Sequence, residues 1–168
     1  YYNKPMQDGL YEHYKAIAQS VEIPVMLYNV PGRTGVDIEA DTAIRLFDDI
    51  KNIYAIKEAT GSLERAIELN AKRADFCVVS GDDAIDFPML ANGAKGIISV
   101  TANLLPNYKS KLVQAVFDGD YNTARDINNE LYPLNKVLFC ESNIIPNDKA
   151  LAVVSCPATN RISISSIN

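Results

Sequence analysis

Four short apolar runs, each followed by turn residues and a helical pattern, constrain the fold of this chain more than any other feature. The runs cover residues 23–28, 53–57, 76–80 and 96–100. They are almost continuously apolar, which is typical of parallel strands covered by helices. Because strand patterns alternate with helical patterns, the sequence predicts βαβ units and a parallel sheet in an α/β fold.

The alternation stops after the fourth run, and a helical region is predicted to follow. Residues 104–117 and 121–139 have apolar side chains at helical spacing. Pro133 is expected to kink the second of these helices, because proline lacks the N–H that continues the backbone ladder. We therefore predict an α/β part at residues 1–103 and a helical region at residues 104–168.

Composition excludes several classes of protein. The 168 residues carry a net charge of −5 without a Lys/Arg cluster, which argues against a nucleic-acid partner. No apolar run approaches the roughly 20 residues of a membrane-spanning helix. Three cysteines without close spacing and a single histidine disfavour both a disulfide framework and a zinc site. We expect a cytoplasmic protein with reduced thiols.

Lys57 is the sharpest single feature of the sequence. It ends a predicted strand whose alternation places Ile53, Ala55 and Lys57 on one face and Tyr54 and Ile56 on the other. In a barrel of parallel strands, functional groups lie at the carboxyl ends of the strands. A lysine there can attack a carbonyl and form a Schiff base. Taken alone, an exposed lysine at a strand end is the more common explanation.

Tyr28 ends the preceding strand in an equivalent position, where a phenol could relay protons, although taken alone a core aromatic is the more common explanation. Arg33 follows in the predicted loop 31–35. Its guanidinium could clamp a substrate carboxylate, or it could be an ordinary solvated arginine. The adjacent carboxylates of Asp82 and Asp83 are interpreted as helix N-caps rather than as acid–base groups.

Four ordered motifs together point to a known family. They are YNVPGRTG at 28–35, IKEATG at 56–61, SGDD at 80–83 and GIISVTAN at 96–103. From Tyr1 to about Leu151 the sequence resembles the dihydrodipicolinate synthase (4-hydroxy-tetrahydrodipicolinate synthase) family of class I pyruvate aldolases and lyases. The resemblance implies part of a (β/α)8 TIM barrel, strands five to eight, followed by a C-terminal helical region. It also implies condensation of pyruvate with aspartate semialdehyde for lysine and diaminopimelate synthesis.

The same resemblance implies a role for each matching residue. Lys57 would form the imine with pyruvate, and Tyr28 would relay protons above that imine. Arg33 would bind a substrate carboxylate, while Gly81 and Ile98 would line the pyruvate pocket. An imine acts as an electron sink for loss of a methyl proton, so this chemistry requires no metal or organic cofactor.

Three further residues match positions with roles in assembly or in the helical region. Tyr2 matches a catalytic relay tyrosine that reaches into the site of a neighbouring subunit. Tyr1 matches a tyrosine stacked at the tight-dimer interface near the lysine effector site. Asn143 matches the asparagine of a motif in the helical domain. The resemblance therefore implies a homo-oligomer, as a tight dimer or a tetramer.

The sequence also departs from the family pattern. The Gly-Thr-Thr-Gly-Glu motif of the family belongs to an N-terminal half that this sequence does not contain, and a typical barrel needs about 250 residues. The sequence accordingly begins at what would be the end of the fourth strand. The run NIIP at 143–146 and Asp148 differ from the usual residues, and from about Val153 the resemblance ends in a strand-like pattern at 161–167.

Two alternatives remain open. A sister enzyme such as N-acetylneuraminate lyase would share Tyr28 and Lys57 but not Arg33 in its PGRTG setting. Alternatively, the chain could be a truncated, non-catalytic polypeptide that retains only assembly surfaces. Half of a barrel would leave an open apolar face, which we expect to be lined by one side chain from each strand: Met26, Ala55, Val78 and Ile98.

Overall fold

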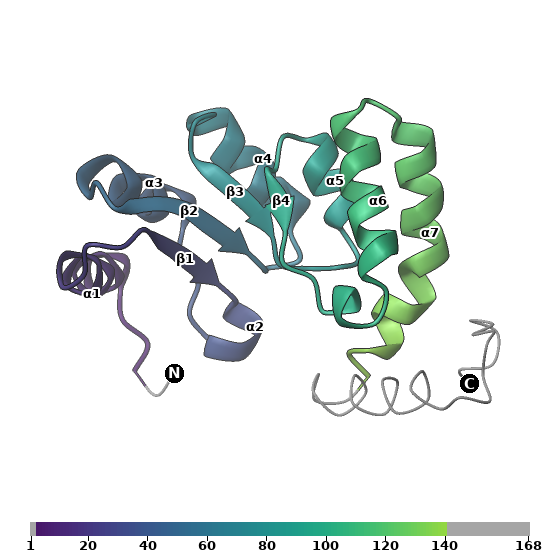
Figure 1. Ribbon diagram of the computed structural model, residues 1–168. Helices are drawn as coiled ribbons and strands as arrows, with labels where there is room; N and C mark the ends of the chain where they lie inside the picture. Colours follow the sequence, from purple (N-terminus) through teal and green to yellow (C-terminus); the bar gives the residue numbers. More distant parts are fainter. Residues whose placement is uncertain (1–2, 141–168) are drawn as a thin grey trace. The chain divides into compact units, whose positions relative to one another are not determined.

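The computed structural model describes residues 3–140, which divide into two compact units, one ending at Ile98 and one beginning at Ser99. In the first unit, strands and helices alternate along the chain as predicted (Figure 1). Its elements are α1 (Gln7–Gln19), β1 (Val25–Asn29), α2 (Pro31–Thr34), α3 (Ala40–Asp49), β2 (Ile53–Glu58), α4 (Leu63–Lys72), β3 (Cys77–Ser80), α5 (Asp86–Ala91) and β4 (Gly96–Ile97).

The strands form one parallel sheet in the order β1-β2-β3-β4. Lys57 is the register partner of Tyr28 on one side and of Val79 on the other. Near the start of the sheet the register shifts, because Val25 pairs with Ile53 while Met26 pairs with Ala55. From Ala55 onward the pairing is regular, so residues paired across these strands share a face.

One face of the sheet packs against helices. Leu27, Ile56 and Val78 are fully buried, and they belong to one apolar cluster with residues of α1, α3, α4 and α5. The expectation that Val78 shares a face with Met26 and Ala55 is therefore wrong. Val78 pairs with Ile56, and this inter-strand register is not encoded in the alternation of a single strand.

Ile53 also departs from the predicted alternation of its strand. It belongs to the same apolar cluster as Ile56, whereas Ala55 does not. The register shift at the start of β2 explains this, because an extra residue in one strand interrupts the alternation of side chains.

The second unit, as far as it is described, is helical. It contains the 3₁₀ helix η1 (Thr101–Asn103), α6 (Pro106–Phe117) and α7 (Tyr121–Val137). Asp120 caps α7 by accepting a hydrogen bond from the Thr123 N–H, and α7 continues through Pro133. The strand-like pattern at 161–167 lies outside the described residues.

Local structure differs from the sequence prediction at three places. The segment around Arg33, predicted as a loop, forms the short helix α2, with Pro31 at its first position and Gly35 left-handed at φ 67° after its end. β4 is only two residues long, since η1 begins soon after it. The Asp82 carboxylate caps a turn at Ala84 N–H rather than helix α5, which begins at Asp86.

Within residues 3–140, no helix is both long enough and apolar enough to cross a membrane.

Candidate active site

Three backbone hydrogen bonds tie the carboxyl ends of the four strands together. The Ala59 N–H donates to Asn29 O at 2.9 Å, joining the ends of β2 and β1. The Gly81 N–H donates to Glu58 O and the Ile98 N–H donates to Ser80 O, both at 2.8 Å. Four of the candidate site residues lie at or next to these bonds, along one edge of the sheet: Tyr28, Lys57, Gly81 and Ile98.

Lys57 and Tyr28 lie side by side at this edge. They are register partners in β1 and β2, so both side chains project from the face opposite the helices. The Lys57 Nζ lies 4.0 Å from the centroid of the Tyr28 ring, within the range of a cation–π contact. In this chain Tyr28 is 44% exposed.

Gly81 lies directly against the Lys57 side chain. A Cβ atom at position 81 would stand 2.8 Å from Lys57 Cε and 2.8 Å from Ala59 Cβ. These distances are shorter than any ordinary carbon–carbon contact, so a side chain at position 81 would displace the lysine. The absence of a side chain here therefore shapes the space in which Lys57 lies.

Arg33 occupies the last turn of α2, which follows β1 almost directly. Its residue is exposed, and within the described part of the chain no carboxylate pairs with its guanidinium. Ile98 follows β4 and is 44% exposed. Tyr1, Tyr2 and Asn143 lie outside the described residues.

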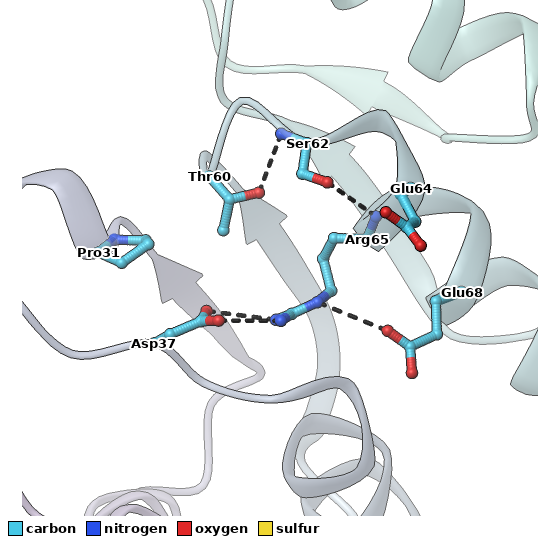
Figure 2. Close-up of a pocket in the computed structure, with 7 residues that line it drawn as sticks. All are labelled: Pro31, Asp37, Thr60, Ser62, Glu64, Arg65 and Glu68. Carbon is cyan, nitrogen blue, oxygen red and sulfur yellow. Dashed lines mark hydrogen bonds and ion pairs between the residues drawn. The ribbon is translucent and has the colours of Figure 1, made fainter.

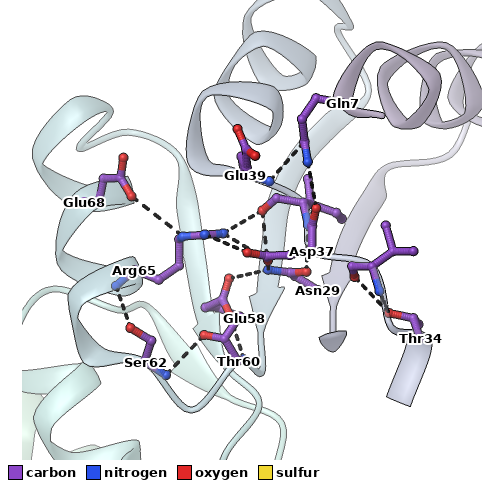
Figure 3. Close-up of polar contacts among 12 residues, drawn as sticks. Gln7, Asn29, Thr34, Asp37, Glu39, Glu58, Thr60, Ser62, Arg65 and Glu68 are labelled. Atoms are coloured by element: carbon purple, nitrogen blue, oxygen red, sulfur yellow. Dashed lines mark hydrogen bonds and ion pairs between the residues drawn. The ribbon is translucent and has the colours of Figure 1, made fainter. Parts of the chain in front are cut away.

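The structure also contains a polar network that the sequence analysis missed, on the helix-facing side of the same strand ends (Figure 3). Asn29 and Glu58 are both 1% exposed, and the Asn29 amide donates to the Glu58 carboxylate at 3.1 Å. Asp37 and Arg65 extend the network through a bidentate ion pair. The sequence contains one signal for this network, which is a polar residue at a strand position that should face the core.

Next to this network lies a hollow of about 400 Å³ (Figure 2). None of the predicted site residues lines it. Its lining residues, most of which have polar side chains, are Pro31, Asp37, Thr60, Ser62, Glu64, Arg65 and Glu68. Burial lowers the pKa of Arg65, but its hydrogen bonds to Asp37 and the charges of nearby carboxylates raise it overall. The guanidinium is therefore a permanently charged structural partner.

The part of the chain that the structure describes contains no cluster of three or more His, Cys, Asp or Glu side chains arranged to hold a metal ion.

Comparisons with known proteins place these features in context. A family model described as "Dihydrodipicolinate synthetase family" matches residues 1–164. The 4-hydroxy-tetrahydrodipicolinate synthases of Aliarcobacter butzleri and Nitratiruptor sp. are 72% and 63% identical to the chain over 151 and 153 residues. These matches cover 90% and 91% of this chain but only 51% and 52% of those proteins, so the chain spans about half their length.

Solved structures of dihydrodipicolinate synthases also match this chain, again over about half of their own length. The dihydrodipicolinate synthase of Aquifex aeolicus is 44% identical with a TM-score of 0.88, over 96% of this chain and 56% of that one. A chloride-inhibited dihydrodipicolinate synthase from Acinetobacter baumannii, solved with pyruvate, is 49% identical with a TM-score of 0.86. That match covers 91% of this chain and 53% of the other.

Proposed function

Because the chain belongs to the dihydrodipicolinate synthetase family, we propose that it supplies the imine-forming part of an enzyme that condenses pyruvate with aspartate semialdehyde. The observation that carries this proposal is the position of Lys57. Its amine lies over the Tyr28 ring at the carboxyl ends of parallel strands, beside a glycine that leaves room for the lysine stem.

The proposed reaction begins when Lys57 Nζ attacks the ketone carbon of pyruvate and water leaves to give an imine. Loss of a proton from the pyruvate methyl group then produces an enamine. The enamine carbon attacks the aldehyde carbon of the semialdehyde, and the resulting alkoxide takes up a proton. Tyr28 is suited to relay these protons because its ring contacts the amine that carries the intermediate.

The other predicted residues have complementary proposed roles. Arg33 orients the semialdehyde through its carboxylate, since Arg33 is exposed and follows β1, the strand that carries Tyr28. Gly81 and Ile98 line the space for pyruvate. Tyr2 relays protons into the site of a neighbouring subunit, and Tyr1 belongs to the interface of the proposed dimer.

The proposal extends to cellular context. We infer a cytoplasmic homo-oligomer, as a dimer or tetramer, that acts in lysine and diaminopimelate synthesis without a metal or organic cofactor. The amino-terminal half of the curated relatives is the expected source of the remaining catalytic groups.

The experiment requires a full-length barrel. We define the completed protein as this chain joined to the part of the Aliarcobacter butzleri relative that it does not cover. With pyruvate present, we expect turnover of aspartate semialdehyde and negligible turnover of a sugar aldehyde such as N-acetylmannosamine. The Lys57→Arg variant should be inactive. Preference for the sugar aldehyde would instead indicate the sister-lyase activity, and activity of Lys57→Arg would contradict the proposed chemistry.

A further inference from the structure

The residues that immediately follow Tyr28 and Lys57 contact each other on the opposite face of the sheet. Asn29 and Glu58 are register partners, one step beyond the Tyr28–Lys57 pair. Successive side chains of a strand point to opposite faces, so this second pair faces the helices directly behind the amine and the phenol. The Asn29 Nδ2 donates to Glu58 Oε2 at 3.1 Å (Figure 3).

Glu58 is held from two sides. Its other carboxylate oxygen, Oε1, accepts a 2.7 Å hydrogen bond from the Thr60 N–H. The side chain thus fixes both the neighbouring strand and the turn that follows its own strand. Because Glu58 is 1% exposed, water cannot substitute for these partners.

Both polar atoms of the Asn29 side chain also have hydrogen-bond partners. Its Oδ1 accepts from the Ile38 N–H at 3.1 Å, and its Nδ2 also donates to Asp37 Oδ1 at 2.8 Å. Arg65 closes the network with hydrogen bonds to Asp37 at 3.2 and 2.9 Å and to Ile38 O at 2.6 Å. The amide of Asn29 therefore cannot rotate without breaking several bonds at once.

We propose that Asn29 and Glu58 form a cross-strand clip that fixes the spacing of Tyr28 and Lys57, and that both are positioning residues for imine formation. The inference rests on the proposed function, in which Lys57 carries the imine. A buried charge with directional partners costs more in desolvation than an apolar pair of similar size, so packing alone does not explain its presence here. The clip joins β1 and β2 one residue after Tyr28 and Lys57.

The hydrogen-bond pattern suggests a reciprocal exchange. Asn29→Asp sets the new carboxylate against those of Glu58 and Asp37 and breaks the clip. Glu58→Gln keeps the size of the side chain but sets two amide donors against each other if the contact with Thr60 is kept. In the double variant, the new amide at position 58 can donate to the new carboxylate at position 29 and still accept from Thr60. Of the two repulsions in Asn29→Asp, only the one with Asp37 remains, so recovery should be partial. Glu12→Gln, at an exposed position of α1, is the matched control.

Two readouts in the completed protein separate positioning from simple structural support. The first is the rate of pyruvate imine formation in a single turnover, with kcat and KM. The second is the carbon-13 methyl resonance of reductively dimethylated Lys57, assigned by its loss in Lys57→Arg. In the parent protein the Tyr28 ring, 4.0 Å from Nζ, should shift this resonance upfield.

We expect each single variant to slow imine formation by about tenfold to a hundredfold, with KM for pyruvate changed by less than about threefold. The upfield shift should shrink by about half or more in both. The double variant should recover part of both readouts relative to Asn29→Asp, and Glu12→Gln should match the parent. If Asn29→Asp does not fold, the isosteric Glu58→Gln variant carries the test alone.

A folded Glu58→Gln variant with the parent's methyl shift and imine rate would overturn the proposal. A folded double variant that does not improve on Asn29→Asp in either readout would also count against the clip. If the parent protein forms no imine at all, the proposed function fails, and the methyl shift still reports whether the clip sets the Tyr28–Lys57 spacing.

Discussion

The two faces of the sheet differ in what their residues do. On the helix-facing side, Leu27, Ile56 and Val78 are fully buried in one apolar cluster. On the opposite side, Tyr28 and Ile98 are each 44% exposed, and Lys57 lies between them in the strand order. The comparison indicates that adjacent positions of one strand have different surroundings, since Ile56 packs in the helix-facing cluster and Lys57 projects from the opposite face.

Truncation of a core residue should have the largest effect on stability. Ile56→Ala removes a fully buried side chain from the helix-facing cluster and should lower the free energy of unfolding by about 2–5 kcal/mol. Tyr28→Phe, on the open face, should lower it by less than about 1 kcal/mol while it reduces turnover. Denaturant unfolding of both variants of the completed protein measures the difference, and equal losses would remove the distinction between the faces.

Loss of the exposed guanidinium should affect the second substrate only. Arg33→Ala should lose roughly 2–4 kcal/mol of transition-state stabilisation for the semialdehyde, which is the range for a lost charge-assisted contact. The imine with pyruvate should still form at the parent rate. Unchanged kinetics toward the semialdehyde would remove Arg33 from the mechanism.

Two glycines provide a matched test of the space beside Lys57. Gly81→Ala places a Cβ 2.8 Å from Lys57 Cε, and we expect slowed imine formation and a stability loss of about 1–3 kcal/mol. Gly96→Ala, in β4, meets no atom within 4 Å and should be well tolerated. Single-turnover kinetics and thermal unfolding of both variants check this. Parent-like imine formation in Gly81→Ala would contradict the assigned role of Gly81.

The smallest predicted effect lies in the helices behind the sheet. The pKa of Tyr11 is raised above 10.0, chiefly because its hydroxyl donates a 2.8 Å hydrogen bond to Asp49. A raised pKa means that this contribution to stability is fully present below pH 10 and is lost as pH rises through the pKa of the folded state.

The stability difference between the parent and Tyr11→Phe should therefore shrink above pH 10, as measured by unfolding at a series of pH values. Tyr132→Phe, at an exposed position of α7, serves as the control. A difference that stays constant through the alkaline range would show that the Tyr11–Asp49 hydrogen bond does not contribute as described.

Much of this organisation is encoded locally. The family and the α/β fold, as part of a (β/α)8 barrel, were predicted from the four motifs and the alternation of strand and helix patterns, and both are confirmed by the comparisons. The shared face of Ala55 and Lys57 follows from strand alternation alone. The helix at Arg33 could have been predicted, because Pro31 and Gly35 are typical of the first position and the end of a helix.

Other features depend on contacts between distant segments. The face of Val78 is set by the register of β3 against β2. The link from Asn29 to Glu58 and Arg65 joins two strands and a helix, and no spacing in the sequence predicts which of their polar atoms meet. These features require the assembled sheet.

The most direct test of the central claim is covalent trapping at Lys57. Borohydride reduction of the completed protein with pyruvate, followed by peptide mass spectrometry, should place the added mass on Lys57. The Lys57→Arg variant should show no adduct under the same conditions. Trapped pyruvate on any other lysine, or an equal yield of adduct in Lys57→Arg, would contradict the assignment of Lys57 as the imine-forming residue.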